Sequence, residues 1–155
     1  MRKFCTQCLY VVLFISSWAS AANQTSSVSV VTSIPVSCQF SNVSPQIVLS
    51  EEALVATGIF NLQCNQKFEL QLSTKSLQEG GNGTFVKASG GTKLKTLIQM
   101  NFIGNVYQLD AVKKIQVDDP ASVEQGTIHV KLAEPVQSTM PKGVYQDVLY
   151  LDVTF

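Results

Sequence analysis

The residues that could carry out chemistry are few in this chain of 155 residues. His129 is the only histidine, and the period of two in "GTIHVKL" places it on the polar face of a strand. Asp118 and Asp119 precede Pro120, a pattern typical of a turn, and the further oxygen ligands of a calcium loop are missing around them. An enzyme needs a nucleophile, a base or a metal held together. We therefore expect no enzyme, no cofactor and no metal site, and a hydrolase would have only His129 as its base.

Two of the four cysteines fall in the first 21 residues. Residues 1–21 have a basic start, an apolar stretch and a terminal "ASA", which is the pattern of a secretory signal peptide. The apolar stretch is shorter than the roughly 20 residues that cross a bilayer, so we expect export without membrane insertion. Cys38 and Cys64 remain in the mature chain, and a cysteine pair in an oxidising compartment predicts one disulfide.

The charge of the mature chain is nearly balanced. The whole chain has 11 Lys and Arg residues and 11 Asp and Glu residues, and Arg2 and Lys3 leave with the signal peptide. Such a balance predicts no nucleic-acid partner. The length allows one domain with a sizeable core.

A hydrophobic period of two predicts the elements that must position these residues. Residues 58–64, 67–73 and 126–132 alternate cleanly, and Gly- and Pro-containing breakers separate them from less regular strand candidates. Six to eight short strands at this spacing predict an antiparallel β-sandwich. One helical turn is expected within residues 50–58, and the Gly-rich stretch 77–95 is interpreted as a long hairpin connection. The less regular candidates are residues 93–104, 105–109 and 113–117.

The two ends of the mature chain carry strand patterns that look complementary. Near the start, "SVSVVTSI" alternates just before Pro35, which separates it from the strand that carries Cys38. At the other end, "GVYQDVLYLDVTF" alternates up to residue 155. An immunoglobulin-type sandwich that ends one strand early would expose its core along its last strand, and an unpaired edge is a template for another chain.

These pieces resemble pilins of the chaperone-usher pathway. Among those pilins they resemble the archaic type, whose subunits contain the spore coat protein U domain. The matching pieces are "SVSVVTSI" before Cys38, "GIFNLQC" followed by "FELQLS", "KLKTLIQMNFIGNVYQLD", and the set Gly143, Tyr145 and Asp147 followed by alternation to Phe155. They cover essentially the whole mature chain. The resemblance implies an all-β fold: an incomplete immunoglobulin-like β-sandwich that lacks its final strand and is completed by donor-strand exchange.

The resemblance also implies a domain plan and a set of partners. Residues 1–21 would be the signal peptide, 22–34 an N-terminal donor-strand extension and 35–155 the pilin domain. A periplasmic chaperone, an outer-membrane usher and neighbouring pilin subunits would be the partners. The subunit would pass through the periplasm to a pilus on the bacterial cell surface and support adhesion or biofilm formation.

The resemblance implies site residues at both ends of the chain, and the carboxylate of Phe155 would be held by the chaperone. The donor residues would be Val28, Val30, Thr32 and Ile34, and the acceptor groove and chaperone contact would include Tyr145, Leu149, Leu151, Val153 and Phe155.

Two other interpretations stay open at this point. Residues 27–34 can form the first strand of a complete, monomeric sandwich. The chain can also be a secreted monomeric binding module for a carbohydrate or a receptor, with Tyr107 and Phe85 as conceivable contacts.

Overall fold

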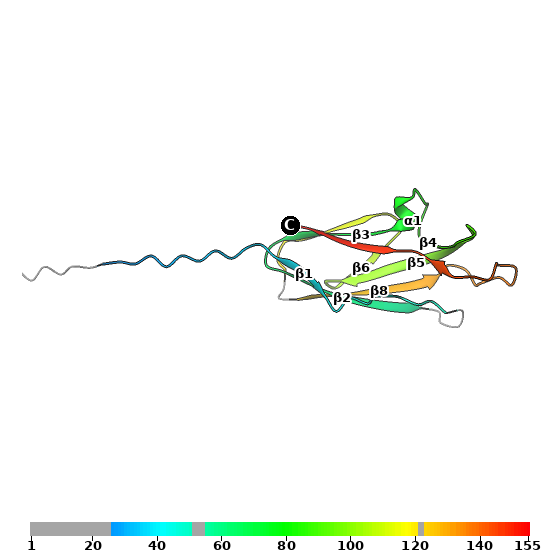
Figure 1. Cartoon of the computed structure of the whole chain (residues 1–155), viewed down its shortest axis with the longest axis horizontal. Helices are drawn as coiled ribbons and strands as arrows, with labels where there is room; N and C mark the ends of the chain where they lie inside the picture. Colours follow the sequence, from blue (N-terminus) through cyan, green and yellow to red (C-terminus); the bar gives the residue numbers. More distant parts are fainter. Residues whose placement is uncertain (1–25, 51–54, 121–122) are drawn as a thin grey trace, which may run out of the picture. The chain divides into compact units, whose positions relative to one another are not determined.

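The structure is a computed structural model that describes residues 26–50, 55–120 and 123–155 (Figure 1). The chain divides into two units, Met1–Ser33 and Ile34–Phe155. The signal-peptide prediction lies outside the described residues, as do residues 51–54 of the expected helical turn; Ala56 already begins a strand there. No helix in the described part of the chain is long and apolar enough to cross a membrane.

The second unit is an antiparallel two-sheet sandwich. The larger sheet has the strand order β1-β2-β8-β5-β4-β9, with β6 also paired to β5, and the smaller sheet has the order β10-β3-β7. The larger sheet contains β1 (Cys38–Ser41), β2 (Ala56–Cys64), β4 (Phe85–Ala88), β5 (Lys93–Phe102), β6 (Asn105–Gln108), β8 (Glu124–Leu132) and β9 (Tyr145–Gln146). The smaller sheet contains β3 (Phe68–Thr74), β7 (Lys113–Val117) and β10 (Leu149–Thr154), and β10, red in Figure 1, runs beside β3.

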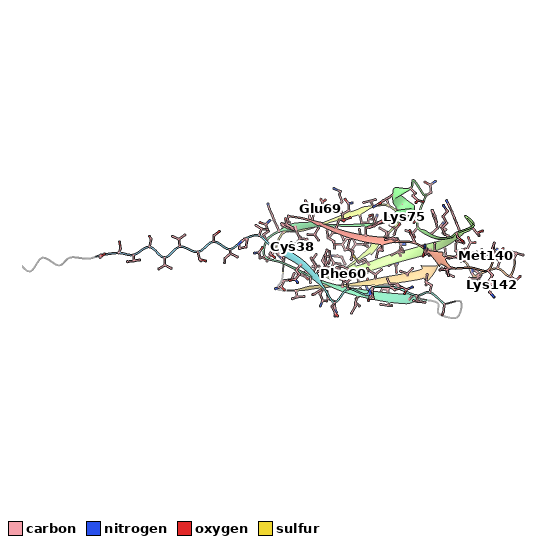
Figure 2. All side chains as sticks on the ribbon, viewed as in Figure 1. Cys38, Phe60, Glu69, Lys75, Met140 and Lys142 are labelled. Atoms are coloured by element: carbon pink, nitrogen blue, oxygen red, sulfur yellow. A yellow bond between two sulfur atoms is a disulfide. The ribbon has the colours of Figure 1, made fainter. Side chains whose placement is uncertain are left out.

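Alternating apolar residues from both sheets form one core. Phe60 of β2 and Phe102 of β5 are fully buried with ring centroids 5.7 Å apart, and Figure 2 shows Phe60 among the side chains that fill the space between the sheets. Gly126 of β8 pairs with Phe60, and a Cβ atom at Gly126 would come within 2.1 Å of that ring. The missing side chain therefore makes room for the aromatic core. Leu62, Leu70, Leu72, Met100 and Leu109 complete its most buried apolar part.

Two elements in the Gly-rich stretch differ from the sequence prediction. Strand β4 forms inside the expected connection and pairs with both β5 and β9. The short helix α1 (Lys75–Gln78) follows β3 directly, and the hydroxyl of Thr74 caps it by accepting a hydrogen bond from the Leu77 amide. Neither element shows an alternation that stands out within the Gly-rich stretch, so the sequence did not predict them.

Residues 26–37 form no strand, although "SVSVVTSI" has a strand pattern. Val28, Val30 and Val31 are exposed. A strand needs a neighbouring strand to satisfy its backbone hydrogen bonds, and no strand pair of the described chain includes these residues.

Candidate functional site

Strand β10 has a partner on one side only. Among the described residues it pairs with β3 and with no other strand, so its second edge keeps unpaired backbone groups. Its inward side chains are half-buried and pack against the core; they are Leu149, Leu151 and Val153. The edge of β10 therefore combines open hydrogen-bonding positions with apolar side chains.

An open groove of about 1120 Å³ runs along this edge. Its floor consists of buried side chains from β5 and β8, and Leu149 and Leu151 of β10 form one wall. Met140 and Lys142, which Figure 2 labels on the loop before β9, line one end. The buried apolar side chains of the floor are Leu94, Ile98, Ile128 and Val130.

The opposite wall is a segment without regular secondary structure. Ile47 and Leu49 alternate inward and are half-buried against the core. Ser44 fixes the segment to β2, because its amide donates to the carbonyl of Ile59 at 2.8 Å and its Oγ accepts from the Ile59 amide at 2.9 Å. A Cβ atom at Gly58 would lie 2.6 Å from the Ile47 side chain, so a larger residue at position 58 would force Ile47 to move. The groove therefore lies between two walls of a sandwich that has space for one more strand.

A carboxylate fixes the end of the groove where β9 turns into β10. Asp147 accepts hydrogen bonds from the Ser76 amide at 3.1 Å, the Ser76 hydroxyl at 2.7 Å and the Val148 amide at 2.9 Å. The Lys75 amide donates to the carbonyl of Val148 at 2.8 Å, and the Phe85 amide donates to Ser76 Oγ at 3.3 Å. Asp147 thus joins the start of β10 to α1 and, through Ser76, to β4.

An asparagine holds the residues that follow the N-terminal extension. Asn65 donates from Nδ2 to the carbonyl of Pro35 at 2.8 Å and accepts from the Ser37 amide at 2.9 Å. Its own amide donates to the carbonyl of Ser37 at 3.1 Å. The disulfide between Cys38 and Cys64 forms beside these bonds, as predicted from the sequence. Residues 35–38 are therefore held covalently and by hydrogen bonds to the end of β2.

The structure brings part of the predicted acceptor set to the groove. Tyr145, Leu149 and Leu151 line it. Val153 faces the core farther along β10, and the side chain of Phe155 is exposed. The predicted donor residues Val28, Val30, Thr32 and Ile34 are exposed.

Sequence reasoning did not find the residues that shape most of the groove. The alternation in β5 and β8 was visible, but the pattern does not tell which buried side chains border an opening. Asp147 was noted only for the resemblance, and no pattern pointed to Ser76 or Asn65.

The other candidate residues do not gather at the groove. His129 lies on the outer face of β8, with Nδ1 at 3.2 Å from Thr57 Oγ1 and Nε2 at 3.4 Å from Asn101 Nδ2. Tyr107 of β6 packs against the core, and the ring of Phe85 on β4 lies under Lys93, whose Nζ is 4.1 Å from the ring centroid. The described residues hold no group of three or more His, Cys, Asp or Glu side chains arranged for a metal ion.

Comparisons with known proteins identify the fold. No protein-family model and no curated protein matches the chain. Among solved structures, the chain is similar to the CsuC-CsuE chaperone-tip adhesion subunit pre-assembly complex from archaic chaperone-usher Csu pili of Acinetobacter baumannii, with a TM-score of 0.53 and 19% identity over 79% of this chain. This chain covers 40% of the length of the chain that it matches. The similarity confirms the predicted all-β sandwich, a fold shared with chaperone-usher pilus components.

A second similar structure is a chaperone-tip adhesin complex described as vital for synergistic activation of CFA/I fimbriae biogenesis. Its TM-score is 0.46 and its identity 7%, over 76% of this chain and 42% of that chain.

Proposed function

We propose that this chain is a structural subunit of a chaperone-usher pilus of the archaic type, related to the spore coat protein U domain family. The observation that carries the proposal is the one-sided strand β10 along an open apolar groove, in a chain that also carries a strand-like segment paired with no strand of the described residues. In the proposed filament, residues 22–34 of one copy fill the groove of the next copy.

Strand addition at an open edge explains both ends of the chain. The incoming segment gains main-chain hydrogen bonds to β10, and its alternate side chains enter the groove. Burying one large apolar side chain contributes about 1.5–3 kcal/mol, so several of them make a long-lived junction. Each copy gives its segment to one neighbour and receives a segment from another. This contact is heterologous and does not close, so it builds a filament.

The proposal includes partners that protect the groove before assembly. An exposed apolar groove and a strand edge promote aggregation, so a periplasmic chaperone would cover them and an outer-membrane usher would exchange the chaperone for the next subunit. The filament would lie on the bacterial cell surface and support adhesion or biofilm formation. No enzymatic role belongs to the proposal.

Polymerisation of the purified, refolded full chain tests the proposal. We expect a ladder of SDS-resistant species with the full chain and none after deletion of residues 22–34. Val30→Asp places a charge on the side expected to enter the groove and should abolish the ladder. Ser29→Asp, on the opposite side of the same segment, is the matched control and should leave it intact.

Two outcomes would contradict the proposal. A full chain that stays monomeric and unfolds cooperatively would favour the secreted monomeric binding module. A deletion of residues 22–34 that unfolds the domain itself would indicate that this segment is the first strand of a complete sandwich.

A further inference from the structure

One polar side chain on the groove floor has no hydrogen-bond partner. Thr96 lies on the inward face of β5 between Leu94 and Ile98, and only 2% of the residue is exposed. Its Oγ1 is buried and finds no partner among the described residues. A buried hydroxyl without a partner destabilises a fold, so each such group calls for a physical explanation.

Thr74 is the other threonine among the buried residues of the groove, and it provides a contrast. Thr74 Oγ1 lies 2.9 Å from Ser76 Oγ and accepts from the Leu77 amide at 3.3 Å. Its hydroxyl therefore already has partners within the subunit, whereas the hydroxyl of Thr96 does not.

Among the four alternate donor residues of the segment proposed to enter the groove, one is polar. Val28, Val30 and Ile34 are apolar, and Thr32 stands at the third of the four alternate positions. A threonine hydroxyl donates one hydrogen bond and accepts others, so two threonine hydroxyls can satisfy each other.

We infer that Thr32 of one copy hydrogen-bonds Thr96 of the next copy and that this pair sets the register of the inserted segment. The inference rests on the proposed function. A change of χ1 rotamer of Thr96 moves Oγ1 to another staggered position about the Cα–Cβ bond, which can turn Oγ1 toward the incoming strand. A shift by two residues would place Thr32 against apolar side chains and leave both hydroxyls unpaired, so the pair disfavours the wrong register.

The pair also determines the direction of the inserted segment. The apolar floor continues from Thr96 toward Ile98 and Val130, so the valines that precede Thr32 should lie on that side. That side is the Phe102 end of β5, and Phe102 pairs with Gly126, the partner of Phe60 near the end of β2.

The connection between β2 and β3 shows which end of β10 lies at this end of the sandwich. Strand β3 starts at this end of the sandwich, and Val153 of β10 pairs with Leu70 near that start. Val28 should therefore lie near Val153, and the segment should run antiparallel to β10.

A double-mutant cycle on polymers of the full chain tests the pair, because each subunit carries both residues. The variants are Thr32→Val, Thr96→Val and the double variant, which keep the side-chain shape and remove one or both hydroxyls. Preformed polymers are diluted into denaturant, and the rate of loss of the SDS-resistant ladder is measured. Each single variant should dissociate about 5- to 100-fold faster than the unchanged chain, because one hydroxyl stays buried without a partner.

The double variant decides between a direct pair and two independent effects. We expect its dissociation rate to return to within about threefold of the unchanged chain, because no hydroxyl is then left unpaired. A rate equal to the product of the two single effects would overturn the inference. It would also be overturned if Thr96→Val changed the dissociation rate and Thr32→Val did not, since Thr32 would then not be the partner.

Cysteine cross-linking tests the register without relying on stability. Thr32→Cys combined with Thr96→Cys should form a disulfide between neighbouring subunits under mild oxidation. The matched control, Val31→Cys with Thr96→Cys, places the first cysteine on the opposite side and should not. Cross-linking of Val30→Cys or Ile34→Cys to Thr96→Cys in place of Thr32→Cys would overturn the register. If the unchanged chain forms no polymer at all, the proposed function fails together with this inference. If polymers form but Thr32 and Thr96 show neither an energetic coupling in the cycle nor a cross-link, the inference alone is overturned.

Discussion

Ile103 occupies a backbone conformation that its side chain disfavours. Ile103 and Gly104 form the two-residue turn between β5 and β6, with φ values of 48° and 70°. A turn with two positive φ values matches the twist of a hairpin, and Asn-Gly is the sequence that it prefers. A β-branched residue in the left-handed region costs about 1–2 kcal/mol. Glycine meets the requirement at the second position, and isoleucine does not meet it at the first.

Ile103→Asn should therefore stabilise the fold. Ile103 is 40% exposed, so the change removes little packing. We expect a gain of about 1 kcal/mol in the free energy of unfolding, measured by chemical denaturation of the chain without residues 22–34, which the proposal expects to stay folded and monomeric. Val106→Asn, at an exposed position in the adjacent strand β6, is a control that should not stabilise. A loss of stability in Ile103→Asn would show that this side chain packs more tightly than its exposure indicates.

Asp110 gives a prediction for pH dependence. Its side chain is exposed and lies 2.7 Å from Lys113 Nζ, whose hydrogen bond and charge hold the pKa of Asp110 below its usual value. A carboxylate with a lowered pKa contributes stability above its unfolded pKa, and that contribution is lost as the pH falls through the folded value. Because the pair is exposed, the contribution should be small and screened by salt.

Asp110→Asn should thus lower stability slightly and equally at pH 6 and pH 8. The difference from the unchanged chain should vanish in acid below the pKa of the carboxyl and also in about 1 M salt. Denaturation curves at these pH values measure it. A difference in stability between Asp110→Asn and the unchanged chain that grows in acid would contradict this expected pH dependence.

At the scale of elements, alternation predicted most strands, and it failed where an element is short or irregular. Residues 58–64 and 126–132 were predicted as strands and lie within β2 and β8. The opposite wall of the groove was not predicted, because Ile47 and Leu49 alternate in a segment too short to be distinguished from a loop. The contacts of Asp147 with Ser76 join residues 71 positions apart, and no local pattern contains that information.

Asp147→Ala should loosen the end of the groove. The substitution removes the carboxylate that accepts three hydrogen bonds and leaves the Ser76 and Val148 amides without this partner. Hydrogen bonds to charged groups contribute about 1.5–3 kcal/mol each, so we expect a loss of at least about 1.5 kcal/mol, measured by denaturation. Amide exchange should increase in α1 and at the start of β10.

Asp152→Ala is the matched control for this change. Asp152 is an exposed carboxylate on β10, the strand that follows Asp147, and its substitution should leave stability nearly unchanged. Equal effects of the two substitutions would show that the loss at Asp147 comes from net charge and not from its contacts.

At the scale of the whole molecule, the disulfide closes a loop that contains β1, β2 and one wall of the groove. Cys38 and Cys64 are 26 residues apart in the sequence. Replacing both cysteines by alanine should lower the free energy of unfolding by about 3–4 kcal/mol, because the open chain gains conformational entropy when it unfolds. Denaturation of the double variant measures the loss. A loss below about 1 kcal/mol would show that the strand pairs alone determine the conformation of this loop.

The attachment of residues 35–38 has a mechanical consequence for a filament built as proposed. Tension would enter a subunit at Pro35, where Asn65 and the disulfide pass it to the start of β3. Strand β3 is hydrogen-bonded along its length to β10, the strand that would hold the neighbour's segment. The load would thus cross each subunit through one covalent bridge and one pair of strands pulled in shear, while β5, β8 and the rest of the larger sheet would carry little force.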